Sequence, residues 1–157
     1  MKNKYQQARK FDKVLYNITD EKAKEMMKSF LISRGHKIVS EVEDYYHDLI
    51  TEKDGVEHYF ELELNLSHEF TSEKDFKYPT ATFLGRKERL HKKHPFHYVV
   101  ICPTTGASVV AYSSEIYQDE YKVEVVVNQP HRKGLDCFYR IPKNKVQFFN
   151  INEPNEK

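Results

Sequence analysis

The sequence lacks the features that mark membrane-spanning, secreted and disulfide-stabilised proteins. It has no tryptophan and only two cysteines, Cys102 and Cys137, which lie far apart in the chain. No run approaches the roughly 20 apolar residues that cross a bilayer. The polar opening, MKNKYQQARKFDK, has no apolar core of the kind found in a secretory signal. We therefore predict a cytoplasmic protein, with no membrane partner, whose cysteines are buried free thiols.

An excess of charge of either sign is also missing. The 25 Lys and Arg residues nearly balance the 24 Asp and Glu residues, which leaves a net charge of +1. Overall charge therefore gives no argument for nucleic-acid binding, and any such argument must come from local basic clusters. The 157 residues, with 39% hydrophobic and 31% charged side chains, are typical of one globular domain. We find no internal repeat and no low-complexity linker.

The patterning predicts an α+β fold, with a mixed central sheet built on an α-β-β-β-α-β core, flanking helices and extra C-terminal strands. Thr19 is placed to cap a helix over 20–34, where Asp20 and Glu21 suit the positive end of the helix dipole. The helix should end at Gly35. We expect strands over 37–45, 47–53, 56–66, 96–102, 107–112, 121–127, 136–141 and 145–150, a second helix over 82–94 ended by Pro95, and a weaker helix over 3–17.

We treat residues 1–157 as a single domain with three parts. Residues 1–18 form an N-terminal extension or helix, 19–102 the core, and 103–157 a β-rich C-terminal part.

Asp54-Gly55 predicts a two-residue hairpin turn, because both residues tolerate a positive φ. Lys53 then pairs with Val56, and counting back places Asp48 opposite Glu61, on the same face as Glu63. The alternating hydrophobic residues point to the other face, into a core: Phe60, Leu62, Leu64 and Leu66.

Carboxylates held close together repel one another unless they share a proton or a cation. Mg²⁺ is a hard cation that prefers such oxygen ligands, and a bound metal can activate water for attack on a phosphodiester. The alternative is that Glu61 and Glu63 are ordinary solvent-facing residues on an antiparallel strand.

The element order, with Asp48 on the second strand and Glu61-Leu62-Glu63 on the third, resembles the PD-(D/E)xK, or restriction endonuclease-like, nuclease superfamily over residues 20–102. The resemblance implies that Asp48, Glu61 and the carbonyl of Leu62 ligate Mg²⁺ or Mn²⁺. Glu63 would ligate the metal or orient the attacking water. No organic cofactor is implied.

The sequence departs from the superfamily pattern at the lysine of the (D/E)xK tripeptide, where Glu63 stands. Some restriction enzymes of the superfamily use Glu-x-Glu, and other members carry the basic residue on the next helix. In that case Lys87 or Arg86 would stabilise the charge on the phosphorus. An acid of the first helix, Glu21 or Glu25, is a further candidate for the site.

Two basic clusters are candidates for contact with the DNA backbone, which binds Lys and Arg by releasing counterions. The alternative is that they are merely solvated faces. The first cluster lies on the expected second helix and the second in an expected loop after His131. Their members are Arg86, Lys87, Arg89, Lys92 and Lys93, and then Arg132 and Lys133. His91, His94 and His97 are spaced like zinc ligands, but Pro95 interrupts them and no Cys pair completes a site.

Two functions on a nuclease-like fold remain open at this stage, beside an unrelated α+β fold with a small-molecule or structural role. The first is a Mg²⁺-dependent nuclease that hydrolyses DNA. The second is a catalytically inactive module of the same fold that binds nucleic acid or a protein partner, which the missing lysine favours. Two-fold symmetric dimers are common, so a homodimer also stays open, although no apolar seam in the sequence predicts one.

Overall fold

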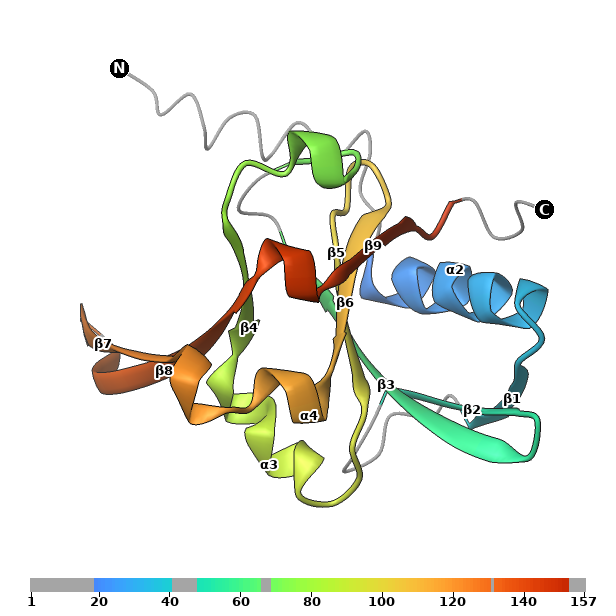
Figure 1. The fold of residues 1–157 in the computed structure, drawn as a ribbon, viewed down its shortest axis with the longest axis horizontal. Helices are drawn as coiled ribbons and strands as arrows, with labels where there is room; N and C mark the ends of the chain where they lie inside the picture. The colour runs from blue at the N-terminus through green and yellow to red at the C-terminus, as the bar shows by residue number, and fades with distance from the viewer. Residues whose placement is uncertain (1–18, 41–47, 66–68, 131, 153–157) are drawn as a thin grey trace.

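The structure is a computed structural model of the chain, and it describes residues 19–40, 48–65, 69–130 and 132–152 (Figure 1). The expected helix over 3–17 lies outside these residues, as do residues 41–47, Leu66 and His131.

Helix α2 (Asp20–Ser33) confirms the first predicted helix, including its cap. The side-chain oxygen of Thr19 accepts a hydrogen bond of 3.0 Å from the backbone N–H of Lys22. The helix ends before Gly35, which has a φ of +94° that favours glycine. One stripe of α2 is buried: Ala23, Met27, Phe30 and Leu31.

Six strands of the described chain form a mixed sheet in the order β1-β2-β3-β5-β6-β9. Strands β3 and β5 run parallel, and the other neighbours run antiparallel. The strands are β1 (Lys37–Ser40), β2 (Leu49–Lys53), β3 (Val56–Leu64), β5 (His97–Ile101), β6 (Ala107–Tyr112) and β9 (Gln147–Asn150). The predicted α+β fold, with a mixed central sheet and additional C-terminal strands, is confirmed.

A second, antiparallel sheet of three strands has the order β4-β8-β7. Its strands are β4 (Thr80–Leu84), β7 (Lys122–Gln129) and β8 (Arg132–Pro142). Short helical turns connect the strands: η1 (Glu73–Asp75), η2 (Gly85–Lys87), α3 (Glu88–His91), α4 (Ser113–Ile116), η3 (Asp119–Tyr121) and η4 (Lys143–Lys145).

The second predicted helix, over 82–94, is largely wrong. Residues 82–84 belong to β4, and the α-helical part is reduced to the single turn of α3. The segment before Gly85 alternates buried and exposed side chains, and Ala81 and Phe83 are 4% and 0% exposed. Pairing of β4 with β8, more than 50 residues later in the chain, therefore overrides the local helical pattern.

The β2–β3 hairpin has the predicted register. Lys53 pairs with Val56 and Leu49 with Phe60, around a turn in which Asp54 and Gly55 have φ values of +54° and +78°. Phe60 is buried against α2, together with the partly buried Leu62 and Leu64, as the alternation predicts.

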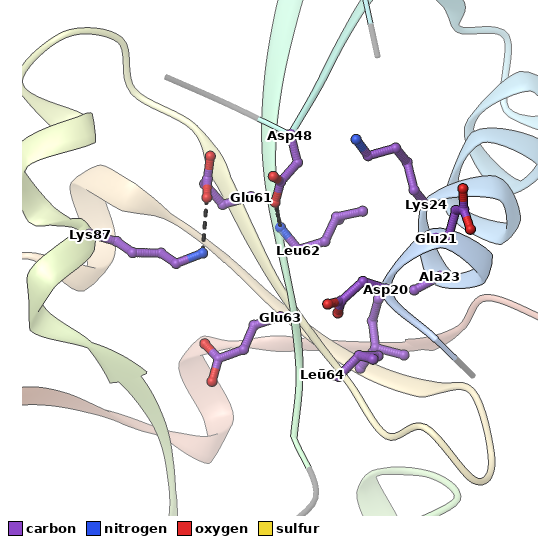
Figure 2. A pocket seen from close by; sticks show the side chains of 11 residues that line it. Asp20, Glu21, Ala23, Lys24, Asp48, Glu61, Leu62, Glu63, Leu64 and Lys87 are labelled. Atoms are coloured by element: carbon purple, nitrogen blue, oxygen red, sulfur yellow. Dashed lines mark hydrogen bonds and ion pairs between the residues drawn. The ribbon is translucent and has the colours of Figure 1, made fainter. Parts of the chain in front are cut away.

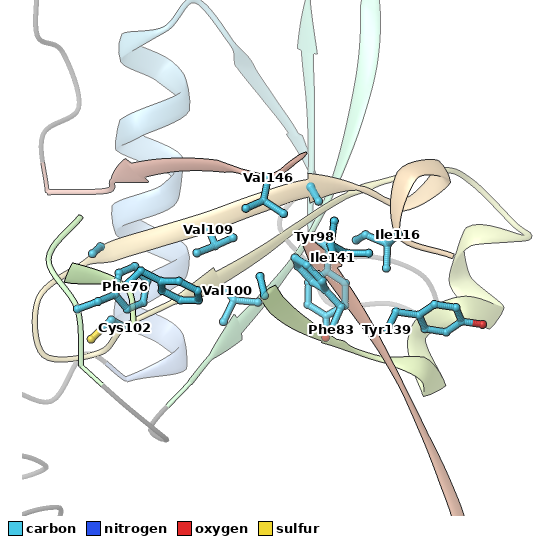
Figure 3. Close-up of a cluster of buried hydrophobic side chains, with 14 of the residues drawn as sticks. Phe76, Phe83, Tyr98, Val100, Cys102, Val109, Ile116, Tyr139, Ile141 and Val146 are labelled. Atoms are coloured by element: carbon cyan, nitrogen blue, oxygen red, sulfur yellow. The ribbon is translucent and has the colours of Figure 1, made fainter. Parts of the chain in front are cut away.

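Hydrophobic clusters pack against the two faces of the six-stranded sheet. Helix α2 covers one face, and the β4-β8-β7 sheet lies on the other (Figure 1). Strand β5 contributes to both. Val99 and Ile101 belong to the cluster that contains the buried residues of α2, whereas Tyr98 and Val100 belong to the cluster of the second sheet (Figure 3). This double burial confirms the interpretation of residues 96–102 as a central strand.

Cys102 and Cys137 are both free thiols. Cys102 is buried, as predicted, whereas Cys137 is only partly buried. Within the described residues, no helix is long and apolar enough to cross a membrane.

Protonation of a histidine cluster should make the fold sensitive to acid. Burial, helped by the neighbouring His58 and His36, lowers the pKa of His97 to about 4. The unfolded chain, with a histidine pKa of roughly 6.5, therefore binds more protons between these values, so stability falls as the pH falls. We expect the free energy of unfolding, measured by urea denaturation, to drop by about 2 kcal/mol from this group between pH 7 and pH 5.

His97→Phe keeps the ring that stacks on Phe60 and should flatten this dependence. His94→Phe, at an exposed ring on Tyr59, is the matched control and should leave it unchanged. Equal pH profiles for wild type and His97→Phe would contradict the assignment.

Candidate active site

The predicted catalytic and metal-binding residues line one pocket of about 410 Å³. Five segments supply its walls. Four of them are drawn with labelled side chains in Figure 2: the first turns of α2, the residue before β2, the second half of β3, and η2. The fifth is β5, through Ile101. The side chains that carry chemistry are Asp20, Glu21, Lys24, Asp48, Glu61, Glu63 and Lys87. The structure thus brings together Asp48, Glu61, Leu62, Glu63 and Lys87, which the sequence analysis selected.

The β2–β3 ladder stops at the Leu49–Phe60 pair, and Asp48 occupies the point where it ends. Its backbone N–H donates to the carbonyl of Phe60 at 3.1 Å, and its Oδ2 accepts from the N–H of Leu62 at 2.9 Å. Asp48 therefore follows the predicted register, but the ladder stops one pair short of the predicted Asp48–Glu61 pair and the Asp48 carboxylate turns to the edge of β3. The physical reason is that Leu62, beyond the last paired residue, needs an acceptor for its N–H.

Glu61 is a buried residue whose carboxylate forms an ion pair with Lys87. The Nζ of Lys87 lies 2.9 Å from Oε1 of Glu61, and their side chains are only 18% and 6% exposed. Figure 2 shows Lys87 reaching Glu61 from one side of β3, while the acidic residues of α2 lie on the other side. Because burying an unpaired carboxylate is costly, this ion pair is the condition on which Glu61 can stay charged inside the fold.

The position of Lys87 depends on a close approach between η2 and β8. A Cβ atom on Gly85 would lie only 2.5 Å from the carbonyl oxygen of Cys137, so the backbone can pass there only because the residue is glycine. The preceding residue, Leu84, donates its N–H to the hydroxyl of Tyr98 at 3.2 Å. These contacts direct η2 toward the six-stranded sheet and bring Lys87 over the Tyr98 ring.

Glu63 has a different partner from Glu61. The buried hydroxyl of Tyr98 donates a short hydrogen bond to Oε1 of Glu63. Burial, reinforced by the charge of Glu63, raises the pKa of Tyr98, so its hydroxyl stays protonated and remains a donor. Tyr98 is a site residue that the sequence analysis missed, because it lies within an apolar run that indicates only a core strand.

Helix α2 adds two acids and a lysine to the pocket. Glu21, one of the two helix acids proposed from the sequence, lines it, whereas Glu25 forms an ion pair of 3.3 Å with Lys28 outside it. Asp20 and Lys24 also line the pocket. The signal for Asp20 in the sequence was the acidic first turn of the helix, which the helix dipole alone was sufficient to explain.

The donor set suits a hard divalent cation, but the carboxylates do not surround a common point. Among the described residues, no group of three or more His, Cys, Asp or Glu side chains is arranged to hold a metal ion. Mg²⁺ commonly binds through only one or two carboxylates, together with water and substrate phosphates. Asp48, just before β2, and Glu61 of β3 meet that smaller requirement if a side chain rotates, with the backbone of Leu62 beside them.

The first basic cluster begins at the pocket and continues away from it. Beyond Lys87, the other four members are exposed on η2, on α3 and in the turn that follows: Arg86, Arg89, Lys92 and Lys93.

The second basic cluster is elsewhere in the fold. Arg132 and Lys133 are not in a loop as predicted, because they pair with Gln129 and Asn128 in the β7–β8 ladder. These pairs are the last of the ladder at the turn of the hairpin, and Figure 1 shows β7 and β8 away from β3. The structure does not bring them to the pocket.

Comparison with protein-family models, with curated proteins and with solved structures gave no significant match to this chain.

Removing the Lys87 ammonium should destabilise the fold by leaving Glu61 buried without a cation. We expect Lys87→Met to lower the free energy of unfolding by about 3 kcal/mol. The double variant Glu61→Leu/Lys87→Met should recover most of that loss, because an apolar pair of similar volume replaces the ion pair. Chemical denaturation of the four proteins of this cycle measures the coupling.

The control is Lys92→Met, at an exposed lysine five residues further along, which should cost less than about 0.5 kcal/mol. A Lys87→Met variant as stable as this control would show that Glu61 does not depend on the ion pair.

Proposed function

We propose that this pocket is the active site of a divalent-metal-dependent nuclease that hydrolyses phosphodiester bonds in DNA. The proposal rests on the meeting of Lys87 with Glu61, 26 residues apart, in a pocket that also contains Asp48 and Glu63. A cation that reaches the acidic strand from the following segment replaces the lysine absent at position 63. The first helix and the three strands after it keep the order on which the resemblance to the PD-(D/E)xK superfamily rests, whereas β4 and short turns stand in place of its second helix.

Asp48 and Glu61 are the residues that would hold Mg²⁺ or Mn²⁺, with the carbonyl of Leu62. In a strand, the N–H and C=O of one residue point to the same edge, so the Leu62 carbonyl shares the edge at which its N–H meets Asp48. A bound divalent ion supplies charge neutralisation at the phosphate and lowers the pKa of an attacking water.

Lys87 and Glu63 would act on the substrate from the face of β3 that also carries Glu61. The side chain of Lys87 is only 18% exposed. Its ammonium can donate to a phosphate oxygen without fully leaving Glu61, and in this partly dry site its charge is weakly screened. Tyr98 fixes one oxygen of Glu63, which limits the positions of the second oxygen for orienting water.

The second candidate is a non-catalytic module that binds nucleic acid or a protein partner. The observation that favours it is that each of the three carboxylates already accepts a hydrogen bond from a different group of the protein. Asp48 accepts from a backbone amide, Glu61 from Lys87, and Glu63 from Tyr98. In this alternative, Lys87 takes the place of the metal and the exposed basic cluster that follows it binds phosphate.

Cleavage of plasmid and short DNA in Mg²⁺ or Mn²⁺ distinguishes the two functions. We expect Asp48→Asn and Glu61→Gln to reduce the cleavage rate by about 100-fold or more, and Lys87→Gln to reduce it by a similar factor without weakening metal binding. Calorimetric titration of Mn²⁺ measures that binding separately.

The matched control is Glu57→Gln, an exposed acid on the same strand whose loss should leave cleavage unchanged. DNA binding without cleavage in any divalent metal would overturn the nuclease proposal and leave the binding module.

A further inference from the structure

A second cavity, of about 460 Å³, opens on the face of the six-stranded sheet that carries Glu63. We call it the aromatic cleft. Its floor is apolar, formed in part by Val100 and Val109, which are 6% and 2% exposed. Phe76 and the 48% exposed Tyr78 form aromatic walls, and Arg140 of β8 provides an exposed guanidinium at the rim.

The walls of the cleft are held in place before any ligand binds. Phe76 packs edge to face on Phe148, with ring centroids 5.2 Å apart. Lys143 donates its ammonium to the carbonyl of Phe76 at 3.0 Å and its backbone N–H to the carbonyl of Pro79 at 2.9 Å. The preceding turn is closed by Asp75, whose Oδ1 accepts two backbone N–H groups at 2.9 Å. Such preorganisation reduces the cost of ordering on binding.

The cleft lies next to the candidate active site on the six-stranded sheet. Glu63, in the active-site pocket, pairs with Val100, on the cleft floor, in the parallel β3–β5 ladder. Paired residues share a face and have side chains about 5 Å apart. Leu64 and Asn65, consecutive in the chain, line the pocket and the cleft respectively.

We propose that the aromatic cleft binds an unpaired nucleobase of the strand whose phosphate occupies the active-site pocket. The proposal rests on the proposed function and names its substrate class: single-stranded DNA, or a duplex from which a nucleotide is turned out. The apolar floor excludes a phosphate but accepts a base ring, which Tyr78 contacts by stacking, while Arg140 meets the adjoining phosphate.

Binding to single strands with and without bases tests the proposal on the wild-type protein. A fluorescein-labelled oligothymidylate is compared with the same strand carrying abasic tetrahydrofuran residues, by anisotropy in EDTA so that no cleavage occurs. We expect the loss of bases to weaken binding about tenfold, and Tyr78→Ala to weaken binding of the base-containing strand by the same factor. Tyr78→Ala should not weaken binding of the abasic strand further.

Two further variants complete the design. Arg140→Gln should weaken the binding of both strands by the same factor, because the abasic strand keeps its phosphates. Tyr112→Ala removes a comparably exposed tyrosine, 38% exposed on β6 and not part of the cleft lining, and should change neither.

The outcomes separate this inference from the proposed function. Equal binding of the two strands by wild type, or equal weakening of both by Tyr78→Ala, would overturn the base site even if metal-dependent cleavage is found. Base-dependent binding without cleavage would support the base site and overturn the nuclease assignment.

Discussion

The burial of Glu61 as a charged group is the constraint on which this site depends. A carboxylate that is almost fully removed from water must be paired with a cation, and the fold supplies Lys87 from a different segment, at 2.9 Å. That requirement fixes the path of the chain after β4, because η2 must pass close to β8 to deliver the lysine. Gly85, against Cys137, permits that approach. The same interaction ties the second sheet to the acidic edge of the first.

The pocket lies where the β2–β3 ladder ends. Past the Leu49–Phe60 pair, β3 has a neighbour on the β5 side, and on its other edge Asp48 meets the N–H of Leu62. Acids on one strand edge and a lysine opposite them form a polar pocket beside two hydrophobic clusters. Chemistry at this pocket would need one conformational change, in which a metal or a phosphate replaces an interaction that the side chains now make with one another.

Much of the hairpin geometry could be predicted from the sequence because it depends on local rules. Asp54-Gly55 sets the register, and the period-two alternation sets which face each residue occupies. Lys87 could be nominated as the basic partner, although only the structure distinguishes it from Arg86. The second helix was wrong because the partner of β4 lies more than 50 residues away, and pairing at that distance leaves no local pattern.

The sequence did not identify Tyr98 and Asp20 as residues of the site, for a related reason. Tyr98 is part of a hydrophobic strand, and its hydroxyl acquires a role only when Leu84 and Glu63 are brought to it. Asp20 is explained equally well by the helix dipole, so its residue type carries no separate signal for a site. The aromatic cleft likewise arises from segments that are dispersed in sequence and meet only through the packing of the two sheets.

The central claim is that a divalent cation is bound between Asp48 and Glu61. A crystal structure determined in Mn²⁺, with anomalous scattering recorded at the manganese edge, tests it most directly. The account predicts one anomalous peak within coordination distance of both carboxylates and the Leu62 carbonyl, with Lys87 displaced from Glu61. Absence of a peak from the pocket at saturating Mn²⁺, with the Glu61–Lys87 ion pair intact, would contradict it.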